Sequence, residues 1–264
     1  MKPTVFLGGG RITTALIAGL RLANYKKPIL VHDRHPEKLR KLSRDFPAVA
    51  ETDLRRAVQQ AGMLVVAVRP DSVFDLLSKI GRLQRPVLAV SLAAGIPLAL
   101  LRARLGSPVQ WARAMPSPAC RSGHGLTAVT FPRSSAKQVR ARVKSFFATV
   151  GAVLEIPESQ FDAFTVTYSC SHGYHALATL ARAGQRLGLD RRTARTAAAH
   201  ALADGILSWR QSKVSLEHLL QEAATPGGIA ATTMASMDKA GYARAVERGL
   251  QAGLKKAKAN AKLG

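Results

Sequence analysis

Three consecutive glycines near the start of the chain have the arrangement of a phosphate-binding turn. An apolar run at residues 5–7 precedes glycines 8–10, and apolar residues then recur at helical spacing over residues 12–20. The first glycine permits a tight turn, and Gly10 lets a pyrophosphate approach the backbone, while free N–H groups of the following helix face the anion. Thr13 replaces the third glycine of G-x-G-x-x-G, so we expect helix and strand to pack slightly further apart. A glycine-rich turn that binds nothing is the alternative.

An acid and a base follow the second predicted strand, residues 28–32. Asp33 lies about 20 to 25 residues beyond the glycines, where a dinucleotide-binding fold holds the adenosine ribose. Asp33 is therefore a candidate acceptor for the 2′-OH of NAD, and Arg34 a candidate for stacking on adenine or pairing with the 2′-phosphate of NADP. The two residues favour different cofactors, because the Asp33 carboxylate would repel the 2′-phosphate of NADP. A solvated strand end is the alternative.

Alternating strands and helices must position these residues. Further strands are predicted at 63–68, 86–91, 109–112, 126–131 and 152–156, and the stretch 113–125 is predicted to be a loop. Helices are predicted at 36–42, 54–61, 73–80 and 136–150, with one more ending at residue 105. The alternation predicts a largely parallel sheet with helices on both sides, which is an α/β fold with an N-terminal Rossmann-type dinucleotide-binding domain.

The second half of the chain is predicted to be entirely helical. Helices are expected at 159–167, 174–187, 191–212, 216–223, 229–239 and 242–262, with breaks at Gly173, Gly188, 226–228 and Gly241. The lysine-rich tail, residues 255–262, is predicted to be a solvated helix end that suits the negative end of the helix dipole. We therefore expect two domains, residues 1–156 and residues 157–264.

The chain is strongly basic. It contains 39 lysines and arginines against 16 acidic residues, which gives a net charge of +23. A nucleic-acid partner is disfavoured, because the arginines are spread along the chain and aromatic residues make up only 5%. The expected consequence of the charge is attraction of anionic cofactors and substrates.

The sequence also indicates the cellular compartment in which the protein is expected. No apolar run reaches the length of a membrane span, and no signal peptide is visible at the N-terminus. Cys120 and Cys170 are far apart and lack metal-ligand spacing, so no metal site is predicted. Free thiols in a reducing cytoplasm are the simplest interpretation.

Six short motifs, in the same order along the chain, resemble those of the pyrroline-5-carboxylate reductase family. The family's F-I-G-G-G-N-M-A is similar to FLGGG at 6–10, and its L-A-V-K-P-Q is similar to VAVRPD at 66–71. The other four are VSLAAGI at 90–96 (V-S-I-A-A-G-I), RAMPS at 113–117 (R-x-M-P-N), AGQRLGL at 183–189 (A-G-V-K-L-G-L) and TPGG at 225–228 (S-P-G-G).

The resemblance implies a fold, a reaction and a set of binding residues. The reaction would be hydride transfer from NADPH or NADH to the C=N carbon of a cyclic imine, giving proline. The helical half would be a dimerisation domain forming an intertwined homodimer, or a higher oligomer built from such dimers. The cofactor-binding residues would be Gly8, Gly10, Arg11 and Ile12 at the pyrophosphate, Ala67, Val68, Arg69 and Pro70 along the dinucleotide, and Ala93, Ala94 and Gly95 beside the nicotinamide.

The substrate side departs from the family pattern. The family's S-G-S-G-P-A-Y corresponds to SCSHGYH at 169–175, in which Ser169 and Ser171 are retained. In the family a threonine follows S-P-G-G and lies near the imine nitrogen, whereas here Ile229 and Ala230 follow the glycines. The resemblance implies that Ser169, Ser171, Gly227 and Gly228 bind substrate.

A new proton donor is therefore expected near the lost threonine. His172, Tyr174 and His175 are the candidates, because a histidine or tyrosine can protonate the reduced nitrogen, and Tyr174 is preferred since a phenol carries no charge into an apolar site. The alternative is that Tyr174 covers a core and that the histidines are solvated or bonded to backbone.

Two classes of function follow. The first is an NAD(P)H-dependent imine reductase, either the proline-forming enzyme or one with another ring substrate. The second is a dinucleotide-binding paralogue without turnover, in a regulatory or scaffold role. NADPH is weakly favoured over NADH, because Arg34, His35 and Lys38 form a positive corner.

Overall fold

The structure is a computed structural model that describes residues 2–46 and 48–263. It divides into two compact units. The first runs from the N-terminus to Tyr168 and also contains the end of the chain from Gly253, and the second is Ser169–Ala252. Each unit is described by itself.

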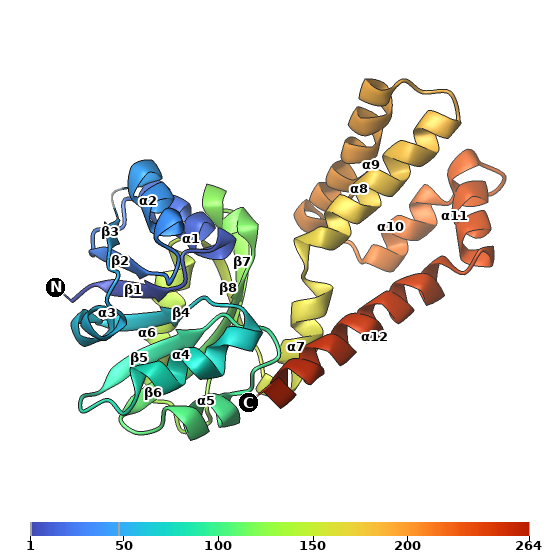
Figure 1. Cartoon of the computed structure of the whole chain (residues 1–264). Helices are drawn as coiled ribbons and strands as arrows, with labels where there is room; N and C mark the ends of the chain where they lie inside the picture. Colours follow the sequence, from blue (N-terminus) through green and yellow to red (C-terminus); the bar gives the residue numbers. More distant parts are fainter. Residues whose placement is uncertain (1, 47, 264) are drawn as a thin grey trace. The chain divides into compact units, whose positions relative to one another are not determined.

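The first unit is built on one eight-stranded sheet (Figure 1). Its strands are β1 (Thr4–Leu7), β2 (Ile29–His32), β3 (Val49–Ala50), β4 (Met63–Val66), β5 (Val87–Ser91), β6 (Val109–Pro116), β7 (Gly125–Thr130) and β8 (Gly151–Glu155). The order is β3-β2-β1-β4-β5-β6-β7-β8, and every neighbouring pair is parallel except β6 with β7, which is antiparallel. The predicted, largely parallel sheet is confirmed.

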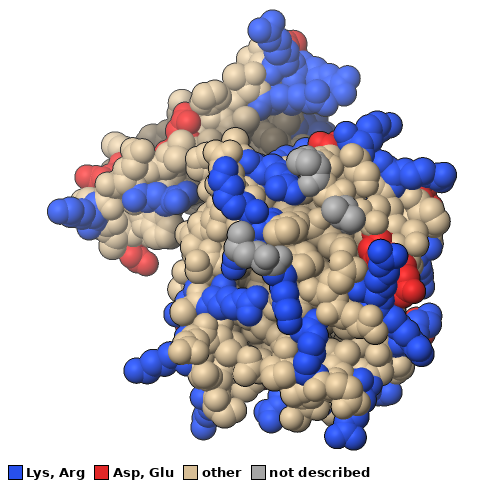
Figure 2. Space-filling view, turned by 90° about the vertical axis from the view of Figure 1, so that its left-hand side faces the viewer, with Lys and Arg blue, Asp and Glu red and all other residues tan. Residues whose placement is uncertain are grey.

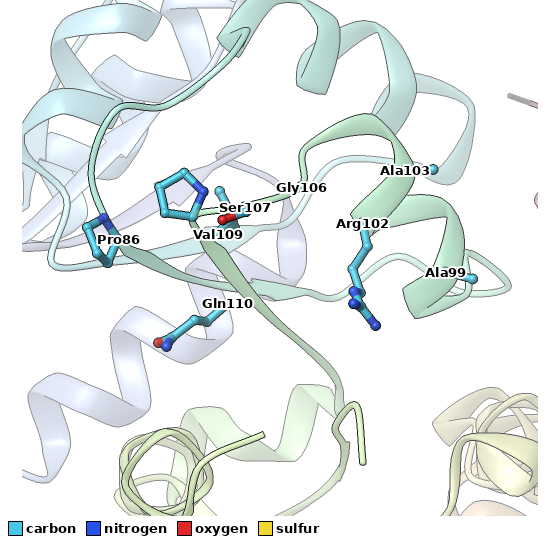
Figure 3. Close-up of a pocket in the computed structure, with 9 residues that line it drawn as sticks. Pro86, Ala99, Arg102, Ala103, Gly106, Ser107, Val109 and Gln110 are labelled. Atoms are coloured by element: carbon cyan, nitrogen blue, oxygen red, sulfur yellow. The ribbon is translucent and has the colours of Figure 1, made fainter. Parts of the chain in front are cut away.

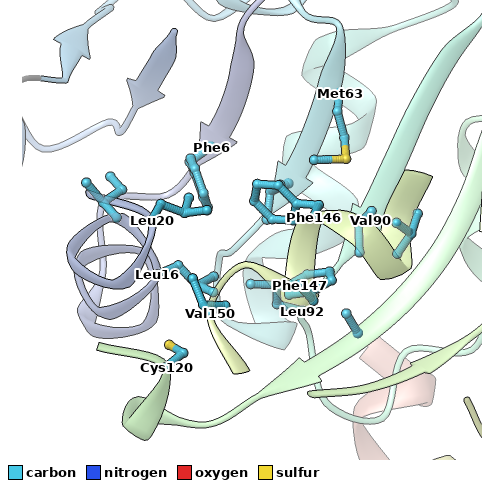
Figure 4. Packing of buried hydrophobic residues seen from close by; sticks show 14 of the residues in the cluster. Phe6, Leu16, Leu20, Met63, Val90, Leu92, Cys120, Phe146, Phe147 and Val150 are labelled. Atoms are coloured by element: carbon cyan, nitrogen blue, oxygen red, sulfur yellow. The ribbon is translucent and has the colours of Figure 1, made fainter. Parts of the chain in front are cut away.

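Helices cover both faces of this sheet. They are α1 (Arg11–Leu22), α2 (Pro36–Asp45), α3 (Leu54–Gln60), η1 (Pro70–Ser72), α4 (Val73–Ile80), α5 (Leu98–Arg104), η2 (Pro118–Ser122), α6 (Lys137–Ala148) and α7 (Glu158–Thr167), where η marks a 3-10 helix. Side chains alternate along each strand, so Phe6 enters one apolar cluster and its neighbours Val5 and Leu7 enter the other. Figure 4 shows the first cluster, where Phe146 and Phe147 pack near Phe6.

Arg113 attaches α7 to the sheet. Its side chain is only 1% exposed, and its two terminal nitrogens lie 3.2 Å from Glu158 Oε1 and 2.8 Å from Asp162 Oδ1. The guanidinium also lies 4.4 Å from the centre of the Phe161 ring. These contacts explain why the first unit extends past the last strand to Tyr168. The domain boundary predicted at residues 156–157 lies between β8 and α7, and it stays a prediction.

The second unit is entirely helical. It contains α8 (Cys170–Arg186), α9 (Arg191–Gln211), α10 (Leu216–Ala223), α11 (Ile229–Lys239) and the first part of α12 (Tyr242–Asn260), which is followed by η3 (Ala261–Leu263) in the first unit. Within this unit only Ala181, Ala194 and Ala198 are buried. Large apolar side chains are exposed instead, including Leu187, Ile206 and Ile229.

Two local expectations were wrong, and one element was not predicted. Gly173 does not break a helix, because α8 already begins at Cys170 with Ser169 as its N-cap. The stretch predicted as a loop at 113–125 continues β6 to Pro116 and then forms η2, because residues 113–116 pair with β7. The two-residue strand β3 was not predicted.

The positive charge is not gathered into one patch on the face shown in Figure 2. On the face shown in Figure 2, lysine and arginine side chains are scattered among uncharged residues, and few acidic residues are visible. No helix among residues 2–46 and 48–263 is long and apolar enough to cross a membrane.

Candidate functional site

The glycine turn lies where the strand order reverses direction. β1 is flanked by β2 on one side and β4 on the other, and open parallel sheets bind ligands at the carboxyl ends of the strands at such a point. The register is level at this edge, since Leu7 pairs with both His32 and Val66, and Val66 pairs with Ser91. The segments that follow β1, β2, β4 and β5 therefore meet at one edge of the sheet.

Gly8 is a glycine for two reasons. Its φ is +112°, in the region that L side chains rarely adopt, and a Cβ there would lie 2.6 Å from the carbonyl oxygen of Ala67. At Gly10, by contrast, a Cβ would meet nothing within 4 Å. The first glycine of the turn is thus packed against Ala67, the residue after β4, whereas the third glycine has free space around it.

The N-terminus of α1 is available to an anion. Gly10 is its N-cap residue and supplies no side-chain cap, and the first turn contains no acidic residue. The first intrahelical amide bond runs from Thr14 to the carbonyl of Gly10, at 3.0 Å. The preceding amides point out of the helix with the positive end of its dipole, and Arg11 is exposed beside them.

Thr13 has a bond that sequence reasoning missed. It is fully buried at the position of the missing third glycine, and its hydroxyl donates a hydrogen bond of 2.6 Å to the carbonyl oxygen of Gly8. The threonine thus ties the first turn of α1 to the turn that precedes it. A threonine at that position is the only sequence signal for this bond.

Asp33 is held against the glycine turn. Its Oδ2 accepts a hydrogen bond of 2.7 Å from the amide of Gly9, and its Oδ1 accepts one of 2.9 Å from the amide of His35. The carboxylate is 8% exposed, and the Nζ of Lys38 lies 3.6 Å away. Each oxygen of the Asp33 carboxylate therefore already accepts a hydrogen bond from a backbone amide within the protein.

The positive corner beside Asp33 is accessible. Arg34 and Lys38 are exposed, and the Nε of Arg34 donates to the Nε2 of His35 at 3.2 Å. These three cationic or titratable groups occupy the chain between β2 and the first turns of α2. A phosphate attached to the adenosine ribose is the kind of group such a corner can bind.

The segments after β4 and β5 lie on the other side of the glycine turn. Val68 lies near Gly8, with its Cγ1 3.2 Å from a Cβ built there, while Arg69 is exposed and paired with Asp71 at 3.1 Å. After β5, Ala93 and Gly95 are buried and Ala94 is half-buried. The predicted cofactor-binding segments of the first unit thus lie along one edge, while their individual roles stay predictions.

The predicted substrate and proton-donor residues belong to the second unit. The Ser169 hydroxyl accepts a hydrogen bond of 3.4 Å from the Ser171 amide and lies 2.7 Å from the Ser171 hydroxyl, so Ser169 is the N-cap of α8. His172, Tyr174 and His175 are exposed on the first turns of α8. Tyr174 also lines a groove between α8 and α9.

The second glycine pair precedes another open helix start. Gly227 has a φ of +75°, and Gly228 is the N-cap of α11 with no side-chain cap and no acidic residue in the first turn. Thr232 and Thr233 do not replace the lost threonine, because their hydroxyls donate back to the carbonyls of Gly228 and Ile229 at 3.0 and 2.8 Å.

A cavity of about 820 Å³ lies away from the dinucleotide edge (Figure 3). Pro86 and Val109 belong to its lining, and they stand at the beginnings of β5 and β6. It is therefore at the amino ends of the strands, opposite the glycine turn, and it is not part of the candidate site. No group of three or more metal-ligating side chains occurs among the residues that the structure describes.

Both halves of the chain match models of known protein families. The family model described as pyrroline-5-carboxylate reductase dimerisation matches residues 158–260, and the one described as NADP oxidoreductase coenzyme F420-dependent matches residues 4–95. The pyrroline-5-carboxylate reductase of Corynebacterium melassecola is 30% identical over 96% of this chain and 96% of its own length. The chain belongs to the pyrroline-5-carboxylate reductase family. The family resemblance and the predicted fold class are thereby confirmed.

Other relatives agree with this assignment. The pyrroline-5-carboxylate reductase of Mycobacterium tuberculosis is 29% identical over 96% of this chain and 94% of its own. The solved structure of the 1-pyrroline-5-carboxylate reductase of Streptococcus pyogenes superposes with a TM-score of 0.89 at 20% identity, covering 97% and 98% of the two chains. The pyrroline carboxylate reductase of Plasmodium falciparum, solved with NADP bound, gives 0.87 at 21% identity and covers 98% of each chain. At these identities the structural likeness supports the fold.

Proposed function

We propose that this protein reduces 1-pyrroline-5-carboxylate to proline with NAD(P)H as the hydride donor. The observation that carries the proposal is the point between β1 and β4 where the strand order reverses, at which a glycine turn and an uncapped helix N-terminus lie at the carboxyl edge of the sheet. Family membership over nearly the whole chain supports the imine as substrate. A place in proline biosynthesis follows from that product.

The cofactor would be held by backbone groups more than by side chains. Gly8, Gly10 and the first amides of α1 at Arg11 and Ile12 would bind the pyrophosphate, since these amides have no acceptor in their own helix. The nicotinamide supplies a hydride when it is bound, and the protein must hold the imine carbon over its face. Ala67, Val68, Arg69 and Pro70, with Ala93, Ala94 and Gly95, would form the remaining walls.

NADPH is the proposed cofactor. Asp33 is tied to Gly9 and His35 and has Lys38 close by, so its charge is less available to repel a 2′-phosphate. Arg34 and Lys38 are exposed at the same corner and can pair with that phosphate.

Substrate handling is assigned to the second unit. We propose that the open N-terminus of α11, at Gly227 and Gly228, binds the substrate carboxylate through backbone amides, with Ser169 and Ser171 as further donors. One of Tyr174, His172 and His175 would protonate the reduced nitrogen. Their exposure on α8 leaves them accessible to a ligand.

The second unit is proposed to form a homodimer. Its three buried residues are all alanines, and this is too small a core for a unit of this length to be stable by itself. The exposed apolar side chains would be covered by a second copy, as the dimerisation description of the matching family model suggests. A cytoplasmic location is proposed because Cys120 and Cys170 form no disulfide.

A steady-state assay of the purified protein with pyrroline-5-carboxylate and each nicotinamide cofactor tests the proposal. Turnover with the five-membered imine, and slower turnover with six-membered analogues, is the expected result. The alternative of a non-catalytic paralogue is favoured by Ile229 and Ala230, which lack the family's hydroxyl. Tight nucleotide binding without reduction of any imine would support that alternative.

A further inference from the structure

The end of the chain packs against the loop that follows β5. The Nδ2 of Asn260 donates a hydrogen bond of 3.1 Å to the carbonyl oxygen of Ala94. A Cβ built on Gly95 would lie 1.9 Å from the carbonyl oxygen of Ala257 and 2.7 Å from its carbon. The backbone of α12 therefore rests directly on the Cα of Gly95, and all of these residues belong to the first unit.

This contact corrects the expectation of a solvated helix end at residues 255–262. Lys255, Lys256 and Lys258 are exposed as predicted, but Ala257 is 5% and Asn260 is 9% exposed. A spacing of three places the two buried residues on one side of the helix, facing the loop. Burying an asparagine amide is costly unless it is hydrogen-bonded, and the Ala94 carbonyl provides the partner.

The rest of the loop is fixed from other directions. The amide of Leu92 donates to the carbonyl of Val66 at 2.9 Å, and the amide of Ala93 donates to the Ser91 hydroxyl at 3.3 Å. Beyond the loop, the amide of Leu98 donates to Glu158 Oε1 at 2.7 Å. The end of α12 thus supports the middle of the loop, between two segments that the sheet and α7 hold.

The loop lies on one specific half of the dinucleotide crevice. If the adenosine lies over β2 beside Asp33, the nicotinamide half must lie on the β4 and β5 side of the switch point. Resting on the proposed function, we infer that Asn260 is a positioning residue that holds the Ala94–Gly95 segment against the nicotinamide half of the cofactor. Asn260 acts through the Ala94 carbonyl and has no part in adenosine binding.

The decisive variant is Asn260→Asp, which keeps the shape of the side chain but replaces the amide donor by a carboxylate facing a carbonyl. We expect its affinity for NADPH and its kcat each to fall about tenfold, because a shifted loop misplaces the nicotinamide. The affinity for 2′,5′-ADP, which represents the adenosine half alone, should stay unchanged. The deuterium isotope effect on kcat with NADPH labelled at nicotinamide C4 should rise as hydride transfer becomes slower.

Asn260→Ala provides a second variant without the added charge, and Lys258→Ala is the matched control because Lys258 is exposed on the same turn. The control should behave as wild type. Equal losses of NADPH and 2′,5′-ADP affinity, or no loss of either in both Asn260 variants, would overturn the inference. If the wild-type protein bound neither NADPH nor 2′,5′-ADP, the proposed function itself would be wrong. If the wild-type protein bound both and the Asn260 variants showed no selective loss, only the inference about Asn260 would be wrong.

Discussion

The carboxylate of Asp33 accepts a hydrogen bond of 2.7 Å from the backbone amide of Gly9. This bond joins the end of β2 to the glycine turn after β1 across 24 positions of sequence. The acid at this position therefore shapes the phosphate-binding turn itself, and its effect on cofactor binding should differ from that of an acid that reads the ribose directly.

Removal of Asp33 should weaken both cofactors alike. We expect Asp33→Ala to lower the affinity for NADPH and for NADH by about tenfold each, because a hydrogen bond to a charged group contributes roughly 1.5 to 3 kcal/mol. Titration of nicotinamide fluorescence measures both constants, and Glu37→Ala, an exposed acid on the adjacent helix, is the control. Tighter NADPH binding with weaker NADH binding in Asp33→Ala would instead mean that Asp33 binds the ribose.

Removal of Arg34 should discriminate between the cofactors. Arg34→Ala is expected to weaken NADPH binding about tenfold and to change NADH binding by less than about twofold, since only NADPH carries the phosphate that a guanidinium pairs with. The same titration reports it, with the exposed Arg40→Ala as control. A wild-type preference for NADH would contradict the proposed assignment.

The proton donor is tested by three single substitutions. Tyr174→Phe should lower kcat by about 10²-fold or more and leave nucleotide affinity unchanged, because a positioned general acid contributes this much. His172→Ala and His175→Ala test the other candidates in the same assay. Unchanged turnover in all three would show that the imine arrives already protonated and that the site works by positioning alone.

Arg113 is expected to be important for stability. Arg113→Met leaves Glu158 and Asp162 without their buried partner, and breaking such a pair costs about 3 to 5 kcal/mol, reduced here because both carboxylates are partly exposed. We expect a loss of roughly 2 to 4 kcal/mol in urea unfolding. Arg69→Ala is the control, since Arg69 forms an ion pair while 85% exposed, and it should cost less than about 1 kcal/mol.

The ionisation of Glu155 should make the thermal stability of the protein depend on pH. A hydrogen bond from the Lys144 ammonium, 2.6 Å from Oε2, lowers the pKa of the Glu155 carboxyl, and Arg140 adds to the effect. A lowered pKa in the folded state gives stability that is present above the ordinary carboxyl pKa and is lost as the pH falls through the folded value. Wild type should therefore melt above Glu155→Gln at neutral pH, and the difference should vanish in acid. A difference that persisted there would exclude ionisation as its cause.

The cofactor half of the fold could be predicted from local patterns. Apolar runs gave the strands, and the glycines with the acid after the second strand gave the crevice, because all of these signals lie close together in sequence. The helix start at Cys170 was not predicted, because Gly173 is typical of a helix break, whereas the hydroxyl of Ser169 caps the first turn. Local propensity cannot decide between a break and a capped first turn.

Contacts between distant segments could not be predicted in this way. Nothing around Arg113 indicates that its partners follow at Glu158 and Asp162, and nothing in the lysine-rich tail marks Asn260 as buried. In both cases the partner is chosen by the packing of helices on the sheet. The roles assigned to Tyr174, His172 and His175 are likewise not decided by sequence.

The bond between Asn260 and Ala94 spans 166 positions of the chain. During synthesis the glycine turn and its neighbouring strands leave the ribosome early, whereas α12 leaves it much later. The loop after β5 can acquire this support only after α12 has been synthesised. A nascent chain would thus form the proposed adenosine-binding segments before the proposed nicotinamide-binding loop is supported, and a ribosome that stalled before α12 would leave that loop without its support.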